Sequence, residues 1–275
     1  MARSQETRQG SVASLWRYPV KSMLGEELSA ADMTERGIAG DRAYALVDPE
    51  SGRVISAKNP RKWGKLFDFR ASFVEAPDLS GTLSAARITF PDGTTATTVE
   101  SDIEERLSAQ LGRPVRLTTS VPTAPRAEGY WPEYEWLEQP GEVFEFDLPP
   151  GTFFDGALVH FLTTATLDRL RSLSPQSRFE VPRFRPNFVI QKSAGVEGFV
   201  ENDWIDRTLA LGDQVRLRVT QPCPRCVMTT LRQGDLPKDP DILRTAVQQN
   251  QGNVGVYASV IRGGSVRRGD SVSLA

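Results

Sequence analysis

Short strand-like segments separated by glycine and proline turns run through most of this chain, and they constrain its fold more than any other feature. The segment Asp41–Asp48 (DRAYALVD) has the residue types of a strand and leads into the turn-forming residues Pro49–Gly52. A strand pattern resumes at Arg53–Ala57, which predicts a hairpin. Further candidate strands lie at 67–75 and 86–90. This pattern predicts a strand-dominated fold.

Three segments interrupt the strands with helical signals. Ser101–Leu111 (SDIEERLSAQL) has Ser101 as a candidate N-cap and Gly112 as a stop signal. Thr163–Leu173 is amphipathic with a threonine N-cap, and Asp239–Gln249 predicts a short helix. Strand-like segments return at 187–191, 209–211, 214–219, 254–261 and 271–274. Together these elements predict a β-rich α+β fold with barrel-like parts.

The segment from Ser120 to Pro150 separates two regions of the chain. It is rich in proline, glutamate and aromatic residues and has little periodicity. We therefore expect residues 121–150 to form a linker or long loop, or a lid, since long loops in compact domains are often functional. The length of 275 residues allows one large domain or two smaller ones. We predict an N-terminal β-barrel-like domain at 11–120 and a second domain at 121–275.

Composition argues against several classes of protein. The net charge of −2 does not suit a general nucleic-acid binder. No stretch approaches the roughly 20 apolar residues that span a bilayer, and Met1–Gly10 lacks the apolar core of a signal peptide. We therefore expect no membrane partner and a cytoplasmic location. Two cysteines and one histidine are too few for a four-ligand zinc site unless carboxylates or a second chain contribute. The motifs of serine hydrolases, P-loop NTPases, Rossmann domains and zincins are missing from the sequence.

The two cysteines have CxxC spacing in Cys223-Pro224-Arg225-Cys226. A neighbouring cation such as Arg225 favours the thiolate, which is both the nucleophile and the metal ligand. A thioredoxin-like dithiol would need a βαβ context, whereas Val227–Leu231 is predicted to be extended. The residues thus leave two main alternatives, a functional thiol and a buried structural pair.

Two guanidinium groups and an amide stand together in the segment RFRPN, at Arg183, Arg185 and Asn187. Guanidinium groups pair bidentately with anions such as phosphate. The two prolines in and before this segment stiffen it, which lowers the entropy cost of presenting these groups. The alternative is a solvated charged loop before a strand. The segment is therefore a candidate anion site.

Several further positions carry weaker signals. Lys21 and Ser22, within YPVKS, could bind phosphate, although a surface lysine at a strand end is commoner. Arg42 follows a turn glycine and an aspartate, a pattern that is more often structural. Thr163 could offer its hydroxyl and helix N-terminal amides to a phosphate, or simply cap the helix. The only histidine, His160, lies in an apolar run and is expected to be a hydrogen-bonded core residue.

These motifs, in this order, resemble the MOSC family, which is named for the C-terminal domain of molybdenum cofactor sulfurase. The resemblance is closest to two-part members, which include the mitochondrial amidoxime-reducing component and bacterial proteins that detoxify hydroxylaminopurine. YPVKS at 18–22 and GDR at 40–42 look like motifs of the N-terminal domain. RFRPN at 183–187 and CPRC at 223–226 look like the MOSC core. The resemblance implies an N-terminal MOSC-associated β-barrel domain followed by a C-terminal MOSC β-barrel domain.

The resemblance also implies a bound molybdenum cofactor (Mo-molybdopterin), whereas pyridoxal phosphate is not expected. Cys226 would be the ligand of molybdenum and the catalytic residue, which agrees with the preference of soft metals for thiolates. Cys223 would lie near the metal ligand without being a ligand itself. The residues that would hold the rest of the cofactor are Lys21, Ser22, Arg42, Thr163, Arg183, Arg185 and Asn187, with Pro224 and Arg225 beside the metal ligand.

The function implied by the resemblance is a molybdenum-dependent oxidoreductase that cleaves the N–O bond of N-hydroxylated small molecules. Two cysteines cannot hold an iron–sulfur cluster, so electrons would come from separate electron-transfer proteins. The same motifs would serve a molybdenum cofactor carrier, or a sulfur-transfer module that carries a persulfide. A binding protein for a phosphorylated small molecule, with ordinary thiols, is a third interpretation.

Overall fold

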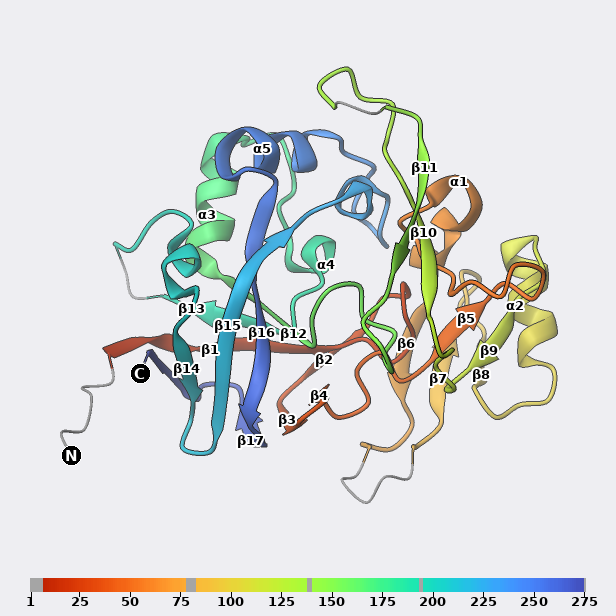
Figure 1. Cartoon of the computed structure of the whole chain (residues 1–275), viewed down its shortest axis with the longest axis horizontal. Coiled ribbons are helices and arrows are strands. Elements are labelled where there is room, and N and C mark those ends of the chain that lie inside the picture. Colours follow the sequence, from red (N-terminus) through yellow and green to blue (C-terminus); the bar gives the residue numbers. More distant parts are fainter. Residues whose placement is uncertain (1–6, 78–82, 138–139, 193–194, 275) are drawn as a thin grey trace.

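A closed β-barrel forms the centre of the C-terminal half in the computed structural model, which describes residues 7–77, 83–137, 140–192 and 195–274 (Figure 1). Seven strands follow one another around the barrel in the order β13-β12-β16-β15-β14-β18-β1, and β1 closes the ring by pairing with β13. Among these seven strands, the β12–β13 pair is parallel and the others pair antiparallel. The strands are β1 (Thr7–Arg17), β12 (Val159–Thr163), β13 (Phe188–Gln191), β14 (Thr208–Leu211), β15 (Val215–Pro224), β16 (Asn253–Arg262) and β18 (Ser271–Leu274). The predicted β-rich fold class is confirmed.

The barrel interior is filled by alternate residues of its strands. Val215, Leu217 and Val219 of β15 are fully buried, whereas the residues between them are partly or fully exposed. This is the two-residue period of a strand with one face in a core. Phe161 and Phe188 stack inside with ring centroids 5.1 Å apart. The interior is therefore a packed core, and a ligand must bind elsewhere.

The start of the chain is tied to the barrel rather than set apart from it. β1 is itself a barrel strand, and β2 (Glu26–Leu28) pairs with the C-terminal end of β1. β3 (Ala30–Thr34) lies between β4 (Gly37–Ile38) and β17 (Gly264–Arg267) in a small sheet. The division at residues 120 and 121 stays a prediction, but these pairings join the two regions in space.

Short sheets and helices form the rest of the N-terminal half. Its elements are β5 (Ala45–Val47), α1 (Pro60–Trp63), the 3₁₀ helix η1 (Gly64–Asp68), β6 (Arg70–Phe73), β7 (Ala86–Thr89), β8 (Thr95–Thr97), α2 (Ile103–Leu111) and β9 (Arg116–Thr118). Of the hairpin predicted from Asp41–Asp48 and Arg53–Ala57, the structure has one antiparallel bridge, Val47 to Val54, and the Val54 amide donates to the Arg126 carbonyl on its other side. Helix α2 ends before Gly112 as predicted, but Asp102, not Ser101, is its N-cap residue.

Residues 121–150 contain a β-hairpin rather than an irregular linker. β10 (Arg126–Tyr130) pairs with β11 (Val143–Asp147), and the hairpin stands beside the N-terminal sheets (Figure 1). Its inward positions on β10 are the small residues Ala127 and Gly129, so the sequence lacks a strong apolar alternation. Gly129 is required there because a Cβ would lie 2.4 Å from the Phe144 ring. Small inward residues thus hid a strand pair from sequence analysis.

Helices cover one side of the barrel (Figure 1). α3 (Thr164–Leu173) and α5 (Asp241–Asn250) bury Leu170, Ile242 and Ala246 against the strands. Thr163 caps α3 as predicted, since its Oγ1 accepts a hydrogen bond from the Thr166 amide at 3.1 Å. The short helical elements are α4 (Val181–Phe184), η2 (Val200–Trp204) and η3 (Val227–Thr230).

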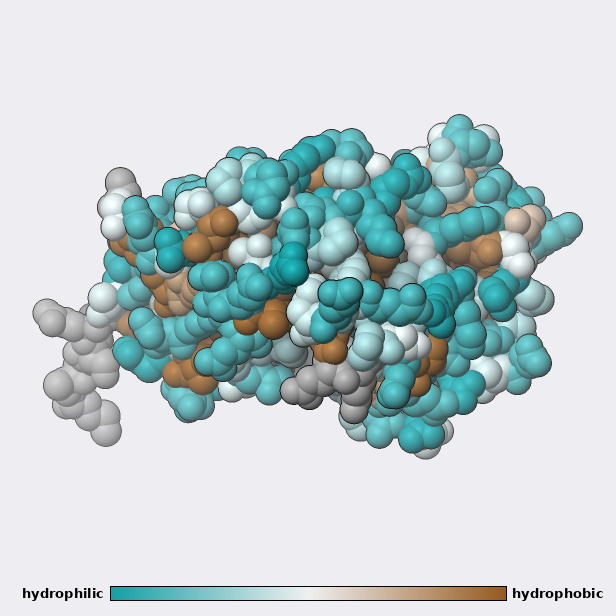
Figure 2. All heavy atoms as spheres, turned by 90° about the horizontal axis from the view of Figure 1, so that it is seen from above, coloured by the Kyte–Doolittle hydropathy of each residue, from teal (hydrophilic) through white to brown (hydrophobic). Residues whose placement is uncertain are grey.

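The surface carries no dominant apolar patch on the face shown in Figure 2, where apolar residues are scattered among hydrophilic ones. Two of the exposed large apolar side chains, Trp131 and Val143, belong to the hairpin region. Within the described ranges, none of the helices has the length and apolar character needed to cross a membrane.

Candidate functional site

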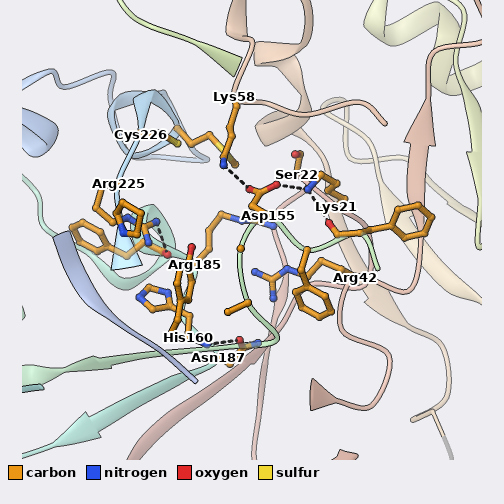
Figure 3. A pocket seen from close by; sticks show the side chains of 18 residues that line it. Lys21, Ser22, Arg42, Lys58, Asp155, His160, Arg185, Asn187, Arg225 and Cys226 are labelled. Atoms are coloured by element: carbon orange, nitrogen blue, oxygen red, sulfur yellow. Dashed lines mark hydrogen bonds and ion pairs between the residues drawn. The ribbon is translucent and has the colours of Figure 1, made fainter. Parts of the chain in front are cut away.

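One pocket is lined by segments that are far apart in the sequence, and most of the predicted site residues meet there (Figure 3). Its volume is about 700 Å³ including the open mouth. Of the ten predicted residues, the structure brings eight to this pocket: Lys21, Ser22, Arg42, Arg185, Asn187, Pro224, Arg225 and Cys226. Thr163 and Arg183 do not line it.

The backbone is unusual at three of these residues. Ser22, Arg42 and Arg185 have φ values of 66°, 49° and 53°, in the left-handed region that favours glycine. Such a conformation costs about 1–3 kcal/mol for each non-glycine residue and clusters at functional sites. Arg185 is the residue at which α4 ends, a position where helices commonly adopt the left-handed conformation. The fold therefore accepts strain to place these side chains.

The aromatic ring of Tyr18 fixes two of the cationic side chains. The guanidinium carbons of Arg42 and Arg185 lie 4.4 and 4.2 Å from its centroid, an attractive cation–π geometry. Arg185 also donates from Nη1 to the Met23 carbonyl at 2.6 Å. Burial lowers the pKa of Arg185 to about 10, so its guanidinium remains charged at neutral pH.

Asp155 links two lysines at the pocket wall, and neither it nor Lys58 was predicted from the sequence. Its Oδ1 binds the Lys21 ammonium, and its Oδ2 lies 3.4 Å from the Lys58 Nζ. Burial would raise the pKa of Asp155, but the two ammonium groups hold it well below its ordinary range. Asp155 is therefore ionised. Both residues lie in stretches without a recognisable motif, so only their position in space reveals them.

The two cysteines have different surroundings. Cys226 is half-buried and lines the pocket, whereas Cys223 is fully buried and receives the Arg225 Nη1 at 2.6 Å. Arg225 also donates from Nη2 to Phe184 O at 2.9 Å, while its buried Nε has no protein partner within the described part of the chain. Burial lowers the pKa of Arg225, but Cys223 and Tyr257 outweigh this effect and raise it.

The segment after Cys226 is not extended as expected. Val227–Thr230 forms the 3₁₀ helix η3, and Val227 and Met228 pack into the apolar core of the N-terminal half. The thiol of Cys226 is therefore held at the boundary between the barrel and the N-terminal core. This boundary position is set by tertiary packing, which a local extended pattern cannot report.

Arg183 has a structural environment. Its side chain is fully buried, and all its nitrogens donate to backbone carbonyls at 2.8 to 3.3 Å. The acceptors are the carbonyls of Arg178, Thr229, Leu231 and Pro237. Two of them flank the end of η3, so Arg183 supports the turn that follows Cys226 from outside the pocket.

Thr163 is also engaged away from the pocket. Besides capping α3, its hydroxyl donates to the buried Glu201 Oε2 at 2.7 Å, and Thr166 donates to the same oxygen at 2.7 Å. Burial raises the pKa of Glu201. The structure therefore gives Thr163 a role in capping and core hydrogen bonding.

Asn187 and His160 organise the floor of the pocket. The Asn187 Nδ2 donates to Trp16 O at 3.3 Å and to Asp41 Oδ2 at 2.8 Å, and its Oδ1 accepts from the His160 amide at 3.0 Å. The His160 Nε2 pairs with Val254 O at 3.1 Å. Burial, together with nearby guanidinium charge, lowers the pKa of His160 to about 3. His160 is thus the hydrogen-bonded core residue that the sequence predicted.

The chemistry of the lining defines a class of site. Five cationic side chains and a single carboxylate line the pocket, which suits an anionic ligand. The buried Arg225 Nε is a donor without an acceptor, as expected if a ligand completes it. Cys226 adds a thiol, a ligand for soft metals. The described residues offer no group of three or more His, Cys, Asp and Glu side chains able to hold a metal ion. The fold and the site thus define a barrel protein with a cationic, thiol-bearing ligand pocket.

Family models match both parts of the chain. The model described as MOSC N-terminal beta barrel domain matches residues 9–100, and the model described as MOSC domain matches residues 150–273. The chain therefore belongs to the MOSC family and has its two-part arrangement, as the sequence motifs indicated. The β10–β11 hairpin lies between the two matched ranges.

Several relatives carry a common name. Mitochondrial amidoxime reducing component 2 of Rattus norvegicus is 25% identical over 305 residues, which cover 98% of this chain and 85% of the relative. Mitochondrial amidoxime-reducing component 1 of Homo sapiens is 26% identical over 238 residues, covering 81% and 66%. Among solved structures, the YUAD protein from Bacillus subtilis superposes with a TM-score of 0.45 and 12% identity over 98% of each chain. YiiM from Geobacillus stearothermophilus has a TM-score of 0.33 and 17% identity over 43% of this chain and 54% of its own.

Proposed function

We propose that this protein binds a molybdenum cofactor in the pocket at Cys226 and reduces N-hydroxylated compounds. The observation that carries the proposal is that one half-buried thiol and five cationic side chains, from segments far apart in the sequence, line the same pocket. The names of the relatives, amidoxime reducing components, support the choice of substrate class. At about 25% identity they support a related activity rather than a particular substrate.

The residues present fit such a cofactor. Cys226 would be the protein ligand of the metal, and the cofactor would bring the remaining ligands, since the described side chains form no multidentate site of their own. Lys21, Arg42 and Arg185 would hold its phosphate and pterin, and the free Arg225 Nε would find an acceptor there. When bound, the cofactor supplies a metal centre that exchanges two electrons with the substrate.

The proposed reaction is the reductive cleavage of an N–O bond. An N-hydroxylated compound takes up two electrons and two protons, the N–O bond breaks, a new N–H bond forms, and the oxygen leaves as water. The electrons come from a separate electron-transfer protein. The contribution of this chain is to present Cys226 in the pocket, to orient the substrate and to stabilise charge on the departing oxygen.

The surroundings of the cysteines disfavour a persulfide relay between them. Such a relay would need both thiols to be accessible, but Cys223 is fully buried and contacts the Arg225 guanidinium. Carriage of the cofactor without turnover, or of a persulfide on Cys226 alone, is the alternative that an assay must separate. A cytoplasmic location remains a prediction.

The first experiment is elemental analysis for molybdenum, together with fluorescence of the oxidised pterin. It uses protein from a cofactor-producing host, with wild type, Cys226→Ser and Cys223→Ser side by side. We expect near-stoichiometric metal and pterin in wild type, and loss of metal in Cys226→Ser only. Neither metal nor pterin in wild type would refute cofactor binding. Bound cofactor without reduction of an N-hydroxylated base by any chemical or protein donor would favour the carrier.

A further inference from the structure

Lys58 is the pocket cation that neither the motifs nor the family resemblance singled out. Its side chain is 21% exposed, against 4% for Lys21, which is held by Asp155 and by the Phe153 carbonyl at 2.8 Å. Figure 3 shows the ammonium of Lys58 and the side chain of Cys226 on the same side of the pocket, away from His160 and Asn187. Lys58 thus lies at the wetter, thiol-bearing end of the site.

The contacts of Lys58 hold its ammonium in place without using all its hydrogens. The Nζ lies 3.4 Å from the Asp155 Oδ2, a long ion pair, and 4.4 Å from the centroid of the Phe146 ring. An ammonium group has three N–H donors, so at least one remains for a ligand. Phe146 belongs to β11 of the hairpin, which lies outside both matched family ranges.

The charged groups around Lys58 favour its ammonium form. Burial lowers the pKa of Lys58, but the carboxylate of Asp155 and the neighbouring Cys226 outweigh this effect and raise it. Lys58 is therefore charged at neutral pH. It is a fixed positive charge beside the proposed metal ligand.

We propose that Lys58 is a catalytic residue that donates a hydrogen bond to the hydroxyl oxygen of the N-hydroxylated substrate, with Asp155 and Phe146 holding it in position. This inference rests on the proposed function. As the N–O bond breaks, negative charge develops on the departing oxygen before it is protonated to water. A preorganised ammonium at that point stabilises the charge more than water does, because it needs no reorientation. The two electrons still come from the separate donor protein, and Lys58 is unchanged over the cycle.

The first test compares wild type, Lys58→Met, Lys58→Arg and the control Lys62→Met, all loaded with cofactor. Lys62 lies four residues away and binds Glu128 at the hairpin, outside the pocket. We expect Lys58→Met to keep molybdenum and pterin and to lose about 10²–10³-fold in kcat/KM, mainly through kcat, as for removal of one oxyanion donor. Lys58→Arg should restore a large part of the loss, and Lys62→Met should match wild type.

A second test needs no turnover. In cofactor-free protein, the thiol of Cys226 is alkylated with anionic iodoacetate and neutral iodoacetamide, with Cys226→Ser as the blank. A lysine charge facing the sulfur favours the anionic reagent. Lys58→Met should therefore lower the rate ratio of the two reagents by about three-fold or more, and Lys62→Met should leave it unchanged.

The outcomes separate the two claims. Wild-type kcat/KM in Lys58→Met, or an unchanged alkylation ratio, would overturn the role of Lys58 and leave the proposed function intact. Loaded wild-type protein that reduces no N-hydroxylated compound would refute the proposed function, and with it the substrate contact. Loss of cofactor from Lys58→Met would also overturn the inference, because Lys58 would then hold the cofactor instead of the substrate.

Discussion

Replacing Arg183 by methionine tests whether the two arginines of the RFRPN segment have different roles, which their common motif does not reveal. Arg183 is fully buried and donates only to backbone carbonyls, whereas Arg185 lines the pocket. We expect Arg183→Met to destabilise the fold with metal and pterin retained at permissive temperature. Arg185→Met should lower cofactor content with a smaller loss of stability.

The expected magnitude follows from the four carbonyls that Arg183 serves. A buried acceptor without a donor costs about 1–3 kcal/mol. Part of this cost is offset when the surrounding structure relaxes or when water enters and hydrogen-bonds to the carbonyls. A net loss of about 4 kcal/mol agrees with the cost of breaking a buried charged interaction, about 3–5 kcal/mol. An unfolding entropy of about 2.1 cal/mol/K per residue gives about 0.6 kcal/mol/K for 275 residues. The loss therefore corresponds to a fall of about 7 °C in Tm.

The assay is calorimetric unfolding of cofactor-free protein, followed by metal and pterin analysis of protein loaded at low temperature. Arg178→Met is the matched control, because the Arg178 side chain makes only exposed contacts, with the carboxylates of Glu180 and Asp235 and with the Asp235 carbonyl, while its own carbonyl remains available to Arg183. A Tm for Arg183→Met within 2 °C of the control, combined with lost cofactor, would refute this assignment and return Arg183 to the binding site.

Two further predictions concern the strands behind the pocket. Gly255→Ala would place a Cβ 2.2 Å from the Phe161 carbonyl at a φ of +82°, so urea denaturation should show a free energy of unfolding lower by about 3 kcal/mol. The control Gly112→Ala, which has a φ of +72° and open space around it, should lose only about 1 kcal/mol. Equal losses in the two variants would contradict the clash. The only histidine, His160, has a pKa of about 3 in the folded protein. Below a pH of about 6.5, the ordinary pKa of histidine, the unfolded chain therefore binds a proton that the folded protein does not, and stability falls as the pH drops from 6.5 towards 3. Between pH 7 and pH 5 the free energy of unfolding should fall by about 2 kcal/mol. His160→Gln should remove that part of the pH dependence, and an unchanged slope would contradict a neutral buried histidine.

The residues that line the candidate pocket were largely predictable where they stand in motifs. YPVKS, GDR, RFRPN and CPRC carry the eight predicted residues that meet at the pocket. The motifs do not distinguish a side chain that faces the pocket from one that supports its wall. Arg183 and Arg185 differ by two positions, yet the end of α4 and the left-handed backbone at Arg185 send them to different surroundings. Asp155 and Lys58 stand in no motif, and only their meeting with Lys21 reveals them.

The sequence by itself determined the strand-rich class, the helices at α2, α3 and α5, and the set of chemical groups available to a site. These follow from local periodicity, capping and turn residues, which act over a few positions. The tertiary structure alone decided that β1 closes the barrel, that residues 121–150 form a hairpin, and that η3 packs into the N-terminal core behind Cys226. Such long-range contacts depend on which apolar surfaces are buried together, and their energy is shared across the whole fold. Burial also decided which of the charged groups are neutralised by protein partners and which remain for a ligand.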